Sequence, residues 1–397
     1  MRMDLPAPVL HSLFSLNQAG YEAYVVGGCV RDSLMGKAPF DWDITTSALP
    51  EETLAVFRDY RTIETGIQHG TVTVIVEDTP LEITTYRVDG DYSDGRHPDA
   101  VAFTRSLAED LRRRDFTVNA MAYSPDKGVV DLFGGLQDLS NSIIRAVGDP
   151  ETRFTEDSLR ILRGLRFSAT LGFAIETTTA KAIHNLGQTL NRVSAERITT
   201  ELTKLLCGQN ASKILEEYAD VLECVIPYQL NYRRVAQFLS MVTPTPLYRY
   251  STLLFDLNEN EVTTLSKKLR FSRCLTEKLQ AIVRYKNTPL SPSSPDVLRL
   301  LNKLGPELTQ VLLSVRAVYD HADYSHIQQL AQNLVIQGAC YRISDLAVKG
   351  VDLLATGMRP GPSIGVALSF LLDAVIDGHC PNEKETLLDY LKQKSLC

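Results

Sequence analysis

Two adjacent glycines, Gly27 and Gly28, constrain the fold of this 397-residue chain more than any other feature. They end an apolar run of β character over residues 24–26, and a helical spacing of apolar residues begins directly after them. Glycine has no Cβ, so the chain can turn tightly here and bring backbone N–H groups close to a ligand. The N-terminus of the following helix and the guanidinium of Arg31 both favour a bound anion. The pattern therefore predicts a strand, a tight turn and a helix arranged around a phosphate group.

Two aspartates, Asp41 and Asp43, follow this unit one residue apart. On a β-strand, side chains at i and i+2 point to the same face, which would aim both carboxylates at one spot and turn Trp42 into the fold. Two carboxylates that face one point repel each other and need a cation, and oxygen ligands of this kind suit Mg²⁺ together with substrate phosphates. Taken alone, Asp-x-Asp is more often a solvated strand edge. With the glycine turn and Arg31 just upstream, it indicates a site for a nucleoside triphosphate.

Composition narrows the class of protein without identifying it. A content of 44% hydrophobic and 22% charged residues is typical of a soluble globular protein, and no run approaches the ~20 apolar residues that span a bilayer. Seven cysteines without a Cys-x-x-Cys pair suggest neither a zinc site nor a disulfide framework, so we expect a cytoplasmic protein without membrane contact. The net charge of −7 disfavours a protein that coats DNA without sequence specificity. Positive charge is nevertheless concentrated locally, at Arg105, Arg112, Arg113, Arg114, Arg145, Arg153, Arg160, Arg163 and Arg166.

The first 140 residues mix helical and strand patterns. Apolar spacing predicts helices over residues 7–19 and 51–57, and alternation predicts a hairpin formed by residues 70–76 and 81–86. We therefore expect a small α/β unit with a mainly antiparallel or mixed sheet. Glu82 lies on the second strand of the hairpin and is either a third carboxylate near the metal or a solvent-facing strand residue.

Two segments later in this unit carry polar groups suited to a nucleotide. Residues 87–104 are polar and glycine-rich without a clear period, which predicts a mobile functional loop. Residues 111–122 predict a helix on which Arg114 could bind triphosphate oxygens and Asn119 a ribose hydroxyl. The alternative for this second segment is a basic surface helix.

From about residue 154 the pattern is helical, with Thr155 as an N-cap. Asp157, Arg160, Arg163 and Arg166 recur every three residues and form one polar stripe opposite an apolar face. Taken alone, such a stripe is more often a solvated surface. Polar residues on a later helix, Glu196, Arg197 and Glu201, are interpreted as structural. Prolines divide the helical remainder, and the segment 288–295 is the best candidate boundary within it.

Together these motifs resemble the class II CCA-adding enzymes, the bacterial-type tRNA nucleotidyltransferases of the poly(A) polymerase superfamily. The resemblance is carried by five motifs in the family's order, over residues 27–43, 113–120, 131–138, 156–160 and 194–201. It extends weakly over residues 345–350 and 381–385, so it covers nearly the whole chain. Trp42 is bulkier than most residues at its position.

The resemblance implies an α/β nucleotidyltransferase head followed by an all-α neck, body and tail in a seahorse-like shape. The corresponding divisions are a catalytic head at 1–140, a neck that recognises the base at 141–206, a body at 207–290 and a tRNA-binding tail at 291–397. The implied partners are tRNA, CTP and ATP, the implied cofactor is Mg²⁺, and the protein is expected to be a monomer or a homodimer.

Site residues follow from the matched motifs. The resemblance implies that Asp41 and Asp43 bind catalytic Mg²⁺, that Gly28 and Arg31 contact the nucleotide's phosphates, and that Arg114, Arg163 and Arg166 also serve the nucleotide. Asp157 and Arg160 would read the base. Cytosine and adenine both present an amino donor beside an acceptor ring nitrogen, whereas guanine and uracil would leave both protein groups unpaired at a high cost.

The expected reaction is template-independent addition of C, C and A to the 3′ end of tRNA with release of pyrophosphate. Glu82 is expected to help hold the metal or to take the proton, and the loop 87–104 and residues 131–138 are expected to move when the nucleotide changes. The alternatives are A-adding or CC-adding enzymes, or a poly(A) polymerase. The intact loop disfavours the CC-adding enzyme, and the acidic balance disfavours the poly(A) polymerase, which tends to carry a longer, basic C-terminal extension.

Overall fold

The computed structural model describes residues 3–89 and 101–394. Within it the chain forms two compact units, Met1–Ala236 and Gln237–Cys397, which are described separately. None of the described helices is long and apolar enough to cross a membrane.

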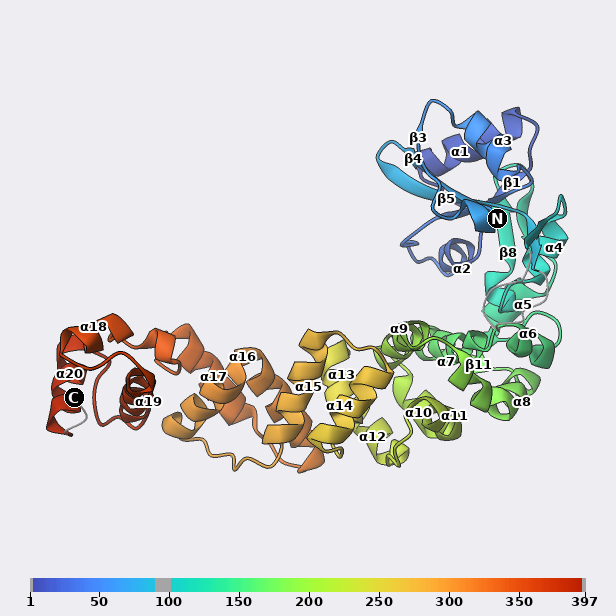
Figure 1. Cartoon of the computed structure of the whole chain (residues 1–397). Helices are drawn as coiled ribbons and strands as arrows, with labels where there is room; N and C mark the ends of the chain where they lie inside the picture. Colours follow the sequence, from blue (N-terminus) through green and yellow to red (C-terminus); the bar gives the residue numbers. More distant parts are fainter. Residues whose placement is uncertain (1–2, 90–100, 395–397) are drawn as a thin grey trace. The chain divides into compact units, whose positions relative to one another are not determined.

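A seven-stranded sheet organises the first unit (Figure 1). Its strands, in spatial order, are β3 (Arg61–Ile63), β4 (Thr71–Val76), β5 (Thr79–Thr85), β2 (Asp43–Thr46), β1 (Ala23–Val26), β8 (Met121–Ser124) and β9 (Gly128–Asp131). Only the pair β2 and β5 is parallel, so the predicted mixed and mainly antiparallel sheet is confirmed. The predicted hairpin is β4 and β5, whose turn places Glu77 and Asp78 at positive φ, as a two-residue type I′ turn requires.

Helices and short loops cover this sheet. They are α1 (Ala7–Gln18), α2 (Gly28–Leu34), α3 (Pro50–Val56), the 3₁₀ turns η1 (Ile67–His69) and η2 (Thr117–Asn119), α4 (Leu107–Arg112) and α5 (Gly135–Ser140). Alternate strand residues are buried in one apolar core with α1, as the period-2 pattern of β4 illustrates. The strands β6 (Arg87–Asp89) and β7 (Val101–Phe103) pair as a separate antiparallel ribbon. The expected mobile loop 87–104 thus begins and ends in paired backbone, and residues 90–100 lie outside the described part.

The helices after the sheet complete the first unit. They are α6 (Pro150–Glu156), α7 (Leu159–Leu171), α8 (Thr177–Leu186), η3 (Gly187–Arg192), α9 (Ala195–Leu206), α10 (Ala211–Glu217) and α11 (Ala219–Val225), and α12 (Tyr232–Leu239) spans the boundary between the units. Two short parallel strands, β10 (Ile143–Ile144) and β11 (Ala174–Ile175), interrupt an otherwise helical segment.

The second unit is helical throughout its described residues. Its elements are α13 (Pro246–Leu253), α14 (Glu259–Lys268), α15 (Arg273–Tyr285), α16 (Ser294–Tyr319), α17 (Ser325–Ile336), η4 (Ile343–Asp345), α18 (Gly350–Ala355), α19 (Pro362–Ile376) and α20 (Lys384–Gln393). The proline-rich segment 288–295 covers most of the connection from α15 to α16 and the first two residues of α16, and a kink at Gly305 divides α16. The predicted fold class, an α/β head followed by helices, is confirmed. The finer divisions at residues 140, 206 and 290 remain predictions.

Candidate active site

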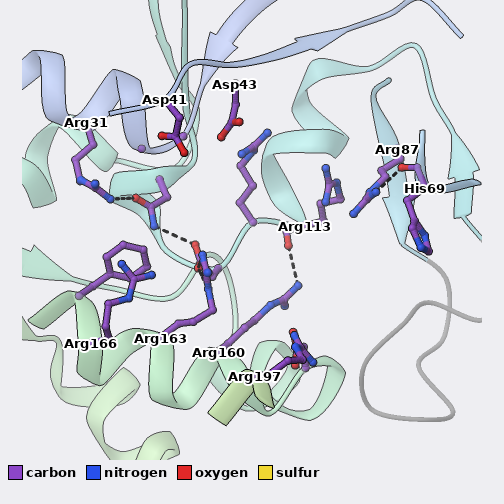
Figure 2. Close-up of a pocket in the computed structure, with 17 residues that line it drawn as sticks. Arg31, Asp41, Asp43, His69, Arg87, Arg113, Arg160, Arg163, Arg166 and Arg197 are labelled. Atoms are coloured by element: carbon purple, nitrogen blue, oxygen red, sulfur yellow. Dashed lines mark hydrogen bonds and ion pairs between the residues drawn. The ribbon is translucent and has the colours of Figure 1, made fainter. Parts of the chain in front are cut away.

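A cleft of about 680 Å³ in the first unit gathers the predicted site residues (Figure 2). Ten of the eleven line it, and the eleventh, Glu82, lies beside it. The ten are Gly28, Arg31, Asp41, Asp43, Arg114, Asn119, Asp157, Arg160, Arg163 and Arg166. In Figure 2 the two aspartates lie at one side of the cleft and the three arginines of α7 at the opposite side.

The predicted glycine turn connects β1 to α2. Gly27 has a φ of +83°, which favours glycine, and its N–H donates to the Met121 carbonyl at 3.1 Å. A Cβ at Gly27 would lie 3.2 Å from Arg114 Nη1. The absence of a side chain here therefore lets Arg114 lie against the turn.

A chain of buried polar contacts crosses the cleft from α2 to α7. Arg31 Nη1 donates to Asn119 Oδ1 at 2.6 Å, and Asn119 Nδ2 donates to Asp115 Oδ1 at 3.2 Å. Asp115 Oδ2 accepts from Arg163 Nε at 2.7 Å. Burial alone would raise the pKa of Asp115, but the Arg163 guanidinium and the Asn119 hydrogen bond outweigh it and lower that pKa to about 2. Asp115 is therefore ionised and holds Arg163 and Asn119 in place.

The single helix predicted over residues 111–122 is wrong. The helix α4 ends at Arg112, Phe116 is extended with a φ of −130°, and Met121 begins strand β8. The backbone of Asp115 to Thr117 instead pairs with a neighbouring segment, because Thr117 N donates to the Arg145 carbonyl and Val147 N to the Asp115 carbonyl. Tertiary pairing overrides the local helical spacing, so that Arg114 reaches the cleft from the loop after α4 and Asn119 from the 3₁₀ turn η2.

The carboxylate pair lies at the start of β2. Asp43 is its first residue and Asp41 precedes the strand, while Trp42 packs against the core as predicted. Enclosure in the cleft and the neighbouring charges of Asp41 and Glu82 raise the pKa of Asp43 to about 6, against the opposing effect of Arg114. Such repulsion between carboxylates is what a bound cation would relieve.

Glu82 is the register partner of Asp43 on the parallel neighbour β5. Residues in register on adjacent strands share a face, so the Glu82 carboxylate is placed beside the pair although it does not line the cleft. The described residues contain no group of three or more His, Cys, Asp or Glu side chains arranged to hold a metal. Asp41 and Asp43 are the two carboxylates that lie together at one side of the cleft (Figure 2).

The helix predicted to begin at Thr155 is instead broken at Asp157. Asp157 ends α6 in an extended conformation, with φ −139° and ψ 101°, and its Oδ1 accepts from Leu159 N at 3.0 Å. Such local side-chain hydrogen bonds are the reason aspartate interrupts helices. The break exposes the Asp157 carboxylate to the cleft, where its Oδ2 accepts from Arg197 Nη2 at 2.7 Å.

Arg160 is 7% exposed and held from several sides. Its Nη1 donates to Glu156 Oε2 at 2.6 Å and to the Arg153 carbonyl at 3.1 Å, and its Nη2 donates to the Arg113 carbonyl at 2.9 Å. Glu156 therefore fixes the Arg160 guanidinium, which lines the same cleft as Asp157.

The rest of the arginine stripe is anchored by α9. Arg166 Nε donates to Glu201 Oε2 at 2.8 Å, and its guanidinium lies 3.6 Å from the centre of the Phe167 ring. Glu201 is buried and thus acts as the structural residue that the sequence indicated. Arg197, interpreted only as structural, lines the cleft as well.

Several further residues line the cleft without a role assigned from the sequence. They are His69, Arg87, Arg113, Asp115 and Phe167. Arg113 and Asp115 flank Arg114 in the second motif, which is a signal that could have included them. His69 lies on η1 and Arg87 on β6. Arg87 Nη1 donates to the His69 carbonyl, and this contact forms only when the chain folds.

A strand–glycine turn–helix head with paired carboxylates, next to helices that present arginines, defines the chain as a nucleotidyltransferase. A family model for the poly(A) polymerase head domain matches residues 23–145, and one for a tRNA nucleotidyltransferase domain 2 matches residues 247–391. A CCA-adding enzyme of Enterococcus faecalis is 38% identical over 400 residues, covering 98% of this chain and 95% of that protein. A CCA-adding enzyme of Bacillus cereus is 36% identical, covering 96% and 97%.

The crystal structure of the Bacillus stearothermophilus CCA-adding enzyme in complex with CTP superimposes with a TM-score of 0.84 at 31% identity and covers 98% of each chain. The protein described here belongs to the family of CCA-adding enzymes.

Proposed function

We propose that this chain adds C, C and A in turn to the 3′ end of tRNA, using CTP and ATP without a template and releasing pyrophosphate. The observation that carries the proposal is the convergence of Asp41 and Asp43, the arginine set and the Asp157–Arg160 pair on one cleft. The curated relatives named CCA-adding enzyme and the solved relative with CTP support it.

Arg31 and Arg114 would bind the triphosphate beside the glycine turn. Arg31 is already fixed by Asn119 and Asp32, and Arg114 lies against Gly27, so their charges are oriented before a nucleotide enters. Gly28 would allow the phosphates to approach the backbone. Arg163 and Arg166 would hold the nucleotide from the α7 side.

Asp157 and Arg160 would select the base. A carboxylate accepts from the exocyclic amino group and a guanidinium donates to the adjacent ring nitrogen, a pattern shared by cytosine and adenine. Glu156 and Arg197 support this assignment because they fix the two selecting groups. Guanine and uracil present a carbonyl to the carboxylate and a ring N–H to the guanidinium, so both contacts to the base would be lost, at about 1–3 kcal/mol each.

Asp41 and Asp43 fit a divalent cation, since their mutual repulsion is the charge pattern that a cation relieves. Nucleotidyl transfer generally uses a divalent metal, and we propose Mg²⁺, which prefers carboxylate and phosphate oxygens. When bound, it would neutralise developing phosphate charge and lower the pKa of the attacking hydroxyl. Glu82 would orient the pair from the neighbouring strand or take the proton of the hydroxyl.

The protein's own contribution is alignment. The tRNA 3′-hydroxyl must approach the α-phosphate from the side of Asp41 and Asp43 while the arginines hold the triphosphate, and such positioning supplies most of the acceleration. The tRNA body would be bound by its shape, mainly by helices of the second unit. The protein would act in the cytoplasm as a monomer or a homodimer.

The test is single-nucleotide sizing of a tRNA transcript that lacks its 3′ end, incubated with Mg²⁺ and CTP, and then with CTP and ATP. Two additions with CTP and a stop at three with both nucleotides are expected. A stop at two with both would indicate a CC-adding enzyme, and a long A ladder a poly(A) polymerase. Extension only of transcripts that end in CC would indicate an A-adding enzyme.

A further inference from the structure

A carboxylate that lies outside the cleft is buried directly behind its arginines. Asp110, on α4, has no exposed surface, and both of its oxygens accept hydrogen bonds. Oδ1 accepts from Arg113 Nη2 at 2.8 Å and Nε at 3.0 Å, and Oδ2 accepts from Arg114 Nη2 at 3.2 Å. Burial by itself would raise the pKa of Asp110, but the two guanidinium groups outweigh it and lower that pKa, so the carboxylate is ionised.

The same carboxylate also contacts the strands that flank the cleft. Thr45 Oγ1 donates to Asp110 Oδ2 at 3.1 Å, and Thr45 lies on β2 two residues after Asp43. Arg87 N, on β6, donates to Oδ1 at 3.4 Å. Asp110 therefore joins Arg114 to the strand that carries Asp43.

Arg114 is placed between this carboxylate and the glycine turn. Its Nη1 lies next to Gly27, its Nη2 is held by Asp110, and its Nε is buried without a hydrogen-bond partner among the described residues. A guanidinium held at one nitrogen keeps other donors available for phosphate oxygens in a fixed orientation.

We propose that Asp110 is a positioning residue, which holds Arg114 in the orientation that binds the triphosphate of the incoming nucleotide. This inference rests on the proposed function, because it requires Arg114 to contact that triphosphate. Asp110 touches neither the nucleotide nor the reacting atoms. Its removal should weaken binding of the phosphates and leave recognition of the base and ribose intact.

The test compares Asp110→Asn with the wild-type protein by titration calorimetry of CTP and CMP. Asparagine preserves the shape of the side chain but removes the charge that attracts Arg114. We expect the dissociation constant of CTP to rise about 10- to 100-fold, as for the loss of a charged hydrogen bond, and that of CMP to change little. In steady state the KM for CTP and for ATP should rise while kcat at saturation changes less.

Glu109→Gln is the matched control, because it makes the same change of charge on the adjacent, exposed residue of α4. It should bind CTP as the wild type does. Asp110→Glu keeps the charge but displaces it by one methylene group. It replaces Asp110→Asn in the CTP and CMP titrations if Asp110→Asn fails to fold. This variant should fold and lose CTP affinity while retaining CMP affinity.

A double-mutant cycle with Arg114→Gln provides an independent readout. If Asp110 acts through Arg114, adding Asp110→Asn to Arg114→Gln should cause little further loss of CTP affinity. Additive losses would overturn the proposal, as would equal losses of CTP and CMP affinity or a variant that is less stable yet binds CTP normally. Failure of the wild-type protein to bind CTP would instead overturn the proposed function, and the inference with it.

Discussion

Three charged side chains of the cleft, Asp157, Arg160 and Arg163, have charged partners before any nucleotide is present. Asp157 accepts from Arg197, Arg160 donates to Glu156, and Arg163 donates to Asp115. These contacts fix the side chains, so a nucleotide meets donors and acceptors that are already oriented. Preorganised polar groups of this kind bind and select at a lower entropic cost than mobile ones.

Asp157→Asn should weaken the discrimination against uracil. The amide can donate to the uracil carbonyl, whereas the carboxylate cannot, and the amide is a weaker acceptor from the amino group of cytosine. We expect kcat/KM for CTP to fall by about 10- to 100-fold, and the ratio of UTP to CTP incorporation to rise. Asp126→Asn, at an exposed position, is the control. An unchanged UTP to CTP ratio would contradict the assignment of Asp157 to the base.

Glu82→Gln separates the two roles left open for Glu82. If Glu82 orients the Asp41–Asp43 pair, the variant should lose about 10- to 100-fold in kcat, as is typical when an outer partner of a metal ligand is removed, and extra Mg²⁺ should recover part of the loss. The measurement is kcat as a function of Mg²⁺ concentration. A loss that Mg²⁺ does not alter, combined with a changed pH profile of kcat, would favour proton transfer by Glu82.

At the level of secondary structure, the backbone at the start of α5 closely approaches the backbone of η2. A Cβ at Gly135 would lie 2.4 Å from the Thr117 carbonyl oxygen and 2.8 Å from Met121 Cγ. Asp131 accepts from Gly135 N and Leu136 N, both at 2.8 Å, and so fixes the same turn. Gly135 therefore packs tightly in this structure, whereas a Cβ at Gly134 would meet no atom within 4 Å, and the motion expected of residues 131–138 remains a prediction.

Gly135→Ala should destabilise the first unit by about 1–3 kcal/mol, because the carbonyl it meets belongs to the backbone and cannot rotate away. Denaturant unfolding monitored by far-UV circular dichroism measures this change. Gly187→Ala is the matched control, since a Cβ there makes only ordinary contacts with Val221 at 3.4 Å and beyond. Equal stability of the two variants would show that the turn has room to adjust.

The helix α8 begins with a charged cap whose effect depends on pH. Glu176 accepts from Thr178 N at 2.9 Å and Thr179 N at 2.8 Å. Burial opposes its ionisation, but the hydrogen bond from the Thr178 hydroxyl and those from the two backbone amides outweigh that effect and lower the pKa of Glu176 to about 2. A carboxyl group with a lowered pKa stabilises the fold above its ordinary pKa, and this contribution is lost as the pH falls toward 2.

Glu176→Gln should therefore lower the free energy of unfolding at neutral pH by about 1 kcal/mol, the usual value of an N-cap. The difference from the wild type should shrink as the pH falls below about 4.5 and vanish near pH 2. Urea unfolding of both proteins across this range measures it. A difference that stays constant with pH would mean that the charge of Glu176 does not stabilise α8.

At the level of the chain, every residue that lines the cleft belongs to the first of the two compact units. The second unit has its own apolar core of helices. Nucleotide binding and attachment of the tRNA body are thus expected to be separable.

Residues 1–236 expressed alone should bind CTP with a dissociation constant within about threefold of that of the full chain, because the contacts to the nucleotide are unchanged. A threefold change in the dissociation constant corresponds to less than 1 kcal/mol of binding free energy. The same fragment should extend tRNA poorly because helices expected to bind the tRNA body are missing. Calorimetry and transcript extension measure the two properties. A fragment that is folded by circular dichroism yet fails to bind CTP would contradict this division.

Much of the secondary structure of the first unit could be predicted because the sequence patterns that determine it are local. The glycine turn, the hairpin and the helix over residues 7–18 depend on backbone freedom and on periodicity within a few residues. The arginine stripe of α7 follows from a spacing of three along one helix. The roles of Asp157 and of the arginines in this stripe rested on the family resemblance, since spacing alone favoured a solvated surface.

Contacts between segments that are distant in the sequence could not be predicted, because local sequence patterns do not encode them. Backbone pairing with residues 145–147 breaks the helix expected over 111–122. Arg197 meets Asp157 across 40 positions, and Asp110 meets Thr45 across 65. Each of these depends on which surfaces pack together, so the partners of a buried charge emerge only when the chain is folded.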